Sequence, residues 1–148
     1  WGGRFAQGPT GSVFALSRSV HFDWRLAPYD LRSSMAHLAI LKKSGLIAAK
    51  DADAINAALK ELATQVADGS FAPIDTDEDV HSALERGLTE KLGAVGGALR
   101  AGRSRNDQVT TDLRLFSIDH MLEIATLITH LQSAILEKAA EYVNDPAP

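Results

Sequence analysis

At 148 residues the chain is long enough for one domain of ordinary size, and its 45% hydrophobic and 23% charged residues are typical of a soluble globular protein. The formal net charge of −4 argues against a general nucleic-acid binder. The absence of cysteine excludes disulfides, a thiolate nucleophile and a thiolate metal site, and it leads us to expect a cytoplasmic protein.

No stretch of the chain approaches the roughly 18 consecutive apolar residues that span a bilayer. The most apolar stretch, residues 121–136, is interrupted by Glu123, His130 and Gln132. The first residues, WGGRFAQGP, lack the basic start and the apolar run of a secretory signal. We therefore expect neither a membrane helix nor a signal peptide, and the start at Trp1 without a methionine suggests a partial product.

Helices are predicted almost throughout, because apolar residues return at intervals of three and four. The first confident helix carries an apolar stripe from Leu31 to Leu41 and ends before Gly45. The second runs over residues 49–68 and ends at Gly69. A third is predicted to open at Thr76, with Asp79 as the partner of a capping box, and to end at residue 93.

The four glycines between residues 93 and 102 predict an irregular loop. After it, no glycine or proline interrupts residues 106–144, which predicts a helix of roughly 55 to 60 Å, longer than the diameter of about 40 Å expected for a compact domain of this length. The middle of this helix is apolar on two sides. We therefore expect neighbours from further sequence or partner subunits, and we place a domain boundary between residues 103 and 104.

Arg100, Arg103 and Arg105 lie beside the glycine-rich segment at the start of the long helix. Guanidinium groups bind carboxylates through two hydrogen bonds, and a helix amino terminus adds partial positive charge. The segment therefore suits an anion. The alternative is structural: Ser104 or Asn106 caps the helix, and the arginines are solvated or pair with nearby carboxylates such as Asp112. The residues alone leave both alternatives open.

Other polar residues give weaker signals. His81, on the third predicted helix, suits a general base, but a histidine on a helix surface is more often structural. The acidic run from Asp77 to Asp79 more often favours a helix dipole than binds a metal. The sequence contains no phosphate-binding glycine loop, dinucleotide fingerprint or zinc pattern, so no metal or cofactor is predicted.

Four motifs resemble the argininosuccinate lyase family of the fumarase and aspartase superfamily: WGGRF at 1–5, FDWRL at 22–26, EDVH at 78–81 and GRSRNDQVTTDLRL at 102–115. The resemblance implies an all-α fold, with an amino-terminal helical domain (1–103) and the first long helix of a central bundle (104–148). It also implies a homotetramer whose active sites each draw on three chains. The implied reaction eliminates arginine from argininosuccinate to give fumarate, without metal or organic cofactor.

The resemblance also implies which residues bind substrate. Ser19 and Asn106 match substrate-contacting positions of the family, Arg103, Ser104 and Arg105 belong to the same GRSRNDQ motif, and His81 is expected near the site.

The catalytic acid and base are expected beyond Pro148, so the chain alone is expected to be inactive. One departure is Arg100 and Ala101, where family members commonly have histidine and threonine. Three alternatives remain: another fumarate-releasing lyase such as one acting on adenylosuccinate, a crystallin-like structural relative, and an isolated helical interaction module.

Overall fold

The computed structural model describes residues 10–146, so the WGGRF motif lies outside the described residues. The chain divides into two compact units, residues 1–113 and residues 114–148. The described part of the chain is helical and contains no strand, which confirms the predicted all-α class. None of its helices is long and apolar enough to cross a membrane.

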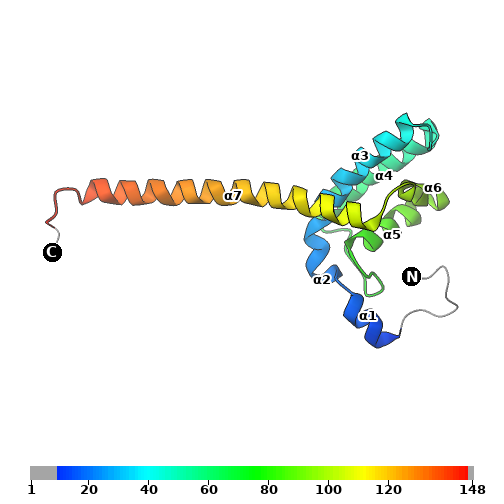
Figure 1. The fold of residues 1–148 in the computed structure, drawn as a ribbon, viewed down its shortest axis with the longest axis horizontal. Coiled ribbons are helices and arrows are strands. Elements are labelled where there is room, and N and C mark those ends of the chain that lie inside the picture. Colours follow the sequence, from blue (N-terminus) through cyan, green and yellow to red (C-terminus); the bar gives the residue numbers. More distant parts are fainter. Residues whose placement is uncertain (1–9, 147–148) are drawn as a thin grey trace. The chain divides into compact units, whose positions relative to one another are not determined.

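The first unit is a group of helices around a core formed by α3 (Ala27–Lys43), α4 (Ala49–Asp68) and α5 (Val80–Leu92). Figure 1 shows α3 lying alongside α4, and α5 contacts both. The predicted apolar stripes form this core, because one face of each helix is buried. Its buried residues include Leu31, Leu38 and Leu41 of α3, Ile55, Leu59 and Leu62 of α4, and Val80, Leu84 and Leu88 of α5.

Shorter elements complete the first unit. Before α3 lie α1 (Gly11–Ser17), α2 (Val20–Asp23) and the 3-10 turn η1 (Trp24–Leu26). After α5 come α6 (Ala94–Gly97) and the 3-10 turn η2 (Ala98–Arg100). The helix α4 ends at Gly69, whose φ of 79° is the left-handed conformation that glycine adopts without steric cost.

The predicted start of the third helix is wrong in its capping residue. The helix α5 begins at Val80, and its N-cap is Asp79. The Asp79 side chain accepts a hydrogen bond from the backbone N–H of Ser82 at 2.6 Å, while the Ser82 hydroxyl accepts one from the backbone N–H of Asp79 at 3.0 Å. A reciprocal box of the same spacing, three residues further along the chain, therefore replaces the expected pair of Thr76 and Asp79.

The irregular loop predicted between residues 93 and 102 is also wrong, because residues 94–100 form α6 and η2. Gly96 explains how these turns fit. A Cβ atom built on Gly96 would lie 2.5 Å from the backbone oxygen of Leu88, so only glycine allows α6 to pack this closely on α5. The glycine at this position therefore allows two helices to approach each other closely and does not mark an irregular loop.

The helix α7 runs from Arg105 to Glu141, close to the predicted 106–144. Its first turns group with the first unit, because Gln108 and Asp112 are buried there. The predicted domain boundary between 103 and 104 stays a prediction. In the second unit, every described residue from 118 to 146 is exposed, including Leu122, Leu127 and Leu131.

Candidate functional site

A buried carboxylate, Asp30 of α3, is the centre of a hydrogen-bonded network in the first unit. Its side chain accepts bonds from the Ser34 hydroxyl at 2.8 Å, from Nε2 of Gln108 at 2.9 and 3.1 Å, and from Nδ1 of His81. Burial raises the pKa of Asp30, but the hydrogen bond and charge of His81 together with the bonds from Ser34 and Gln108 outweigh it, so the pKa lies below its usual value.

A second carboxylate, Asp112 of α7, is completely buried beside the first. Its Oδ1 accepts a bond from the Ser33 hydroxyl at 2.6 Å. Its Oδ2 lies 3.8 Å from Nδ1 of His81 and has no hydrogen-bond partner among the described residues. Burial and, to a smaller extent, the neighbouring charge of Asp30 outweigh the lowering contributions from Ser33, His81 and Arg103, and they raise the pKa of Asp112 to about 6.

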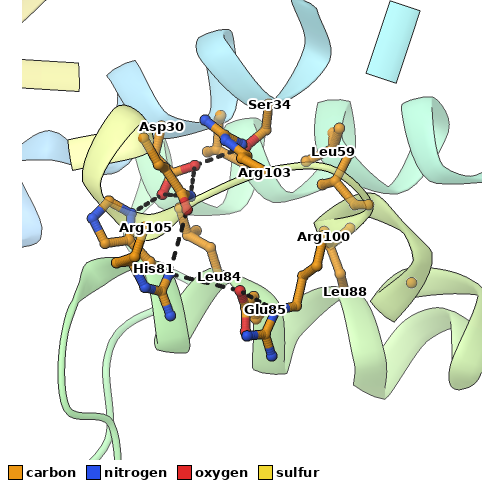
Figure 2. A pocket seen from close by; sticks show the side chains of 14 residues that line it. Asp30, Ser34, Leu59, His81, Leu84, Glu85, Leu88, Arg100, Arg103 and Arg105 are labelled. Atoms are coloured by element: carbon orange, nitrogen blue, oxygen red, sulfur yellow. Dashed lines mark hydrogen bonds and ion pairs between the residues drawn. The ribbon is translucent and has the colours of Figure 1, made fainter. Parts of the chain in front are cut away.

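Arg103 connects both carboxylates through two serines. Its Nη1 donates to the Ser34 hydroxyl at 2.7 Å and its Nη2 to the Ser33 hydroxyl at 2.8 Å. A hydroxyl carries one hydrogen, so each serine accepts from the arginine and is free to donate to a carboxylate. Figure 2 shows Arg103 directed toward Ser34. The guanidinium group of Arg103 therefore belongs to the network, to which it donates two hydrogen bonds.

The other two arginines of this segment line one pocket together with Glu85 of α5, toward which both are directed (Figure 2). Arg105 places Nη1 3.4 Å from Oε1 of Gln108 and 3.6 Å from Oε1 of Glu85, and Nε 3.7 Å from Oδ2 of Asp79. Arg100 places Nε 3.4 Å from the same Glu85 oxygen. The pocket also includes Asp30 and His81 and has apolar walls, formed by Leu31, Leu59, Leu84, Leu88 and Leu99.

His81 lies at the centre of this arrangement, and the expectation of a helix-surface histidine is wrong. Only 2% of the residue is exposed, because the face of α5 that carries it packs against α3. Of the predicted site residues, His81, Arg103 and Arg105 line the pocket.

Ser104, Asn106 and Ser19 lie outside the pocket lining. The Ser104 hydroxyl accepts a bond from the backbone N–H of Asn106 at 3.2 Å and so caps α7, and Asn106 is exposed beside it. Ser19 directly precedes α2 and contacts the segment that leads into α5, because its backbone N–H donates to the carbonyl of Glu78 at 2.8 Å. Its hydroxyl donates to Asp23 at 2.6 Å.

The sequence did not single out the buried polar set itself, which consists of Asp30, Ser33, Ser34, Gln108 and Asp112. Asp112 was considered only as a partner for arginine. One signal was available: Asp30 and Ser34 lie four residues apart, directly beside the apolar stripe that starts at Leu31, and polar residues at that spacing share a helix face. Their burial depends on α7, which sequence periodicity cannot place.

Asp30, His81 and Asp112 have potential metal-ligand atoms within 4.8 Å of one another. The contacts favour hydrogen bonding over metal binding. Nδ1 of His81 faces Asp30, and a carboxylate can only accept, so this nitrogen carries a proton and offers no lone pair. Both oxygens of Asp30 already accept from Gln108. We therefore interpret the cluster as a proton-bearing polar network.

A protein-family model described as Lyase matches residues 6–146, and the chain belongs to this lyase family.

Its similarity extends to argininosuccinate lyases: that of Frankia casuarinae is 55% identical over 148 residues, that of Acidothermus cellulolyticus 53% over 148 and that of Nocardia farcinica 52% over 149. Each match covers the whole chain but only 32%, 30% and 32% of the relative's length, respectively. The resemblance predicted from the motifs is confirmed.

Proposed function

We propose that the full-length protein containing this chain is an argininosuccinate lyase, which eliminates arginine from argininosuccinate and releases fumarate. The observation that carries the proposal is the identity of 52–55% to proteins of that name across the whole chain. The pocket supports it independently, since Arg100 and Arg105 line one concave surface and their guanidinium groups are partly exposed. Substrate and product both carry several carboxylates, which guanidinium groups recognise well.

The six predicted binding residues divide into two groups in this proposal. Ser19, Asn106 and Arg105 contact substrate, with Ser104 fixing the start of α7 on which two of them lie. Arg103 and His81 support the site without contacting substrate, because their side chains hydrogen-bond to Ser33, Ser34 and Asp30. Rigid support of this kind keeps binding groups in place without reorganisation during the reaction.

The chemistry requires a base that removes a proton next to a carboxylate, with stabilisation of the resulting carbanion, and an acid that assists departure of the guanidinium nitrogen. We propose that segments outside these 148 residues supply both groups, that the active protein is a cytoplasmic homotetramer, and that no metal or organic cofactor takes part. Residues 1–148 alone should then show no turnover.

The direct test is an assay of the complete gene product with argininosuccinate and, separately, with adenylosuccinate, following fumarate release. Cleavage of argininosuccinate alone is expected. Cleavage of adenylosuccinate alone would assign the protein to the sister reaction and reject the proposal. Release from neither substrate by a folded, tetrameric protein would favour a crystallin-like structural relative. An assay of residues 1–148 in parallel tests the claim of inactivity.

A further inference from the structure

Glu85 lines the pocket and lies between two guanidinium groups. One of its oxygens, Oε1, is 3.4 Å from Nε of Arg100 and 3.6 Å from Nη1 of Arg105 (Figure 2). The three side chains are accessible, with exposed fractions of 32% for Glu85, 37% for Arg105 and 70% for Arg100. A single carboxylate therefore serves two cations on a surface that a ligand can reach.

The contacts of Glu85 are loose. Hydrogen bonds between a guanidinium group and a carboxylate measure about 2.7 to 2.9 Å, shorter than either distance here. Ion pairs that remain partly exposed contribute little to stability, so separating them is easy. Arg103, in contrast, donates to Ser34 and Ser33 at 2.7 and 2.8 Å and is not available to a ligand.

The wall beside these charges is apolar. Leu84 and Leu88 of α5 and Leu99 of η2 line the same pocket, and each is at most 7% exposed. Two cations next to an apolar wall suit a short carbon chain that ends in carboxylates. An isolated anion such as phosphate would gain nothing from the wall.

We propose that Glu85 is an internal substitute for a ligand carboxylate, and that a short dicarboxylate displaces it and binds between Arg100 and Arg105. This makes Arg100 a specificity-determining residue that selects for a second negative charge. The subsite rests on the proposed function only for the identity of the dicarboxylate, which is then fumarate or the fumarate-yielding half of the substrate.

The test is calorimetric titration of the full-length protein with fumarate and with its monomethyl ester. Arg100→Ala should weaken fumarate binding about tenfold, the scale of one charge-assisted contact, and should affect the monoester less. Glu85→Gln should tighten fumarate binding by about three- to tenfold, because it removes the carboxylate that faces both arginines, while Asp79 stays beside Arg105. Matched controls lie outside the pocket: Arg32→Ala removes an exposed arginine of α3, and Glu90→Gln removes a carboxylate of α5 that pairs with Arg86.

The double variant Glu85→Gln/Arg100→Ala separates displacement from a general charge effect. If Glu85 competes with the ligand for Arg100, most of the gain from Glu85→Gln disappears once Arg100 is removed. An equal gain in both backgrounds, or unchanged binding in Arg100→Ala, would overturn the proposal. The result is distinct from that of the proposed function: a protein that binds fumarate through Arg100 but does not cleave argininosuccinate retains the subsite and loses the function.

Discussion

Asn106 is the second residue of α7, and its side chain faces solvent beside the Ser104 cap. Exposed positions of this kind contribute little to folding, so Asn106→Leu should change the melting temperature of the full-length protein only slightly. If Asn106 contacts substrate, the same change should lower kcat/KM for argininosuccinate by about 10²-fold or more. Steady-state kinetics decide this, and activity close to that of the parent protein would remove Asn106 from the site.

Asp112 should make stability depend on pH in an unusual direction for a carboxylate. Its pKa in the folded protein is about 6, above the ordinary value of 3.8, so the folded state binds the proton more tightly than the unfolded state. The stabilisation is fully present below pH 3.8 and is lost as the pH rises through about 6. Ionised Asp112 then destabilises the fold by about 1 to 3 kcal/mol, at 1.36 kcal/mol for each pKa unit.

The matching variant is Asp112→Asn, which keeps an acceptor for Ser33 and removes the charge. Its melting temperature relative to the parent protein should rise as the pH increases from 3.8 to about 6 and then level off, as measured by thermal unfolding of the full-length protein in a pH series. Ser33→Ala leaves the carboxylate in place and serves as the control. A difference that stays flat or falls over this interval would show that Asp112 is ionised in the folded protein throughout.

At the scale of single elements, the start of α5 depends on one reciprocal pair of hydrogen bonds, between Asp79 and Ser82. Asp79→Ala should destabilise the protein by about 1 kcal/mol, the usual effect of losing an N-cap. Thr76→Ala, at the exposed position where the sequence predicted the cap, should change stability by less than about 0.5 kcal/mol. Denaturant unfolding of both variants compares the two positions, and the reverse order would restore Thr76 as the cap.

The packing of α6 on α5 gives a sharper pair of substitutions. Gly96→Ala places a Cβ atom 2.5 Å from the backbone oxygen of Leu88, which cannot rotate away, so a loss of about 1 to 3 kcal/mol is expected. Gly97→Ala meets nothing within 4 Å at a helical φ of −65°, and it should be neutral or stabilise by up to about 1 kcal/mol. Equal effects in thermal unfolding would contradict this account of α6.

The same elements show what the sequence could and could not predict. The helices α3, α4 and α7 were predictable because their apolar residues repeat along the chain and glycine follows α3 and α4. The site was only partly predictable. Arg103 and Arg105 were found because anion-binding groups cluster locally, but Asp30, His81 and Asp112 are separated by 51 and 31 residues, and their meeting depends on how α3, α5 and α7 pack. The burial of His81 follows from that packing, and the residues next to His81 in the sequence do not predict it.

For the whole molecule, the exposed apolar residues of the second unit are the decisive feature. Met121, Leu122, Ile124, Leu127 and Leu131 each expose 55–69% of their surface, more contiguous apolar surface than monomeric proteins usually leave in water. Residues 1–148 alone should therefore associate, with a sedimentation mass above the 15.9 kDa of one chain. Leu127→Lys/Leu131→Lys should shift the equilibrium toward monomer, and a stable monomer of the unsubstituted chain at all concentrations would contradict this prediction.

The polar network has a consequence for the order of folding. Its hydrogen bonds connect residues 51, 69, 70, 78 and 79 positions apart. Contacts across such long loops form slowly, because closing a long loop costs conformational entropy. We therefore expect them to form after the local helices. During synthesis, the side-chain donors of Asp30 emerge in the order Ser34, His81 and Gln108, while Arg103 and Asp112 join the network through the two serines. Until residue 108 has left the ribosome, Asp30 lacks the two hydrogen bonds from Gln108, so the nascent first unit should acquire its native protection against hydrogen exchange only with the opening turns of α7.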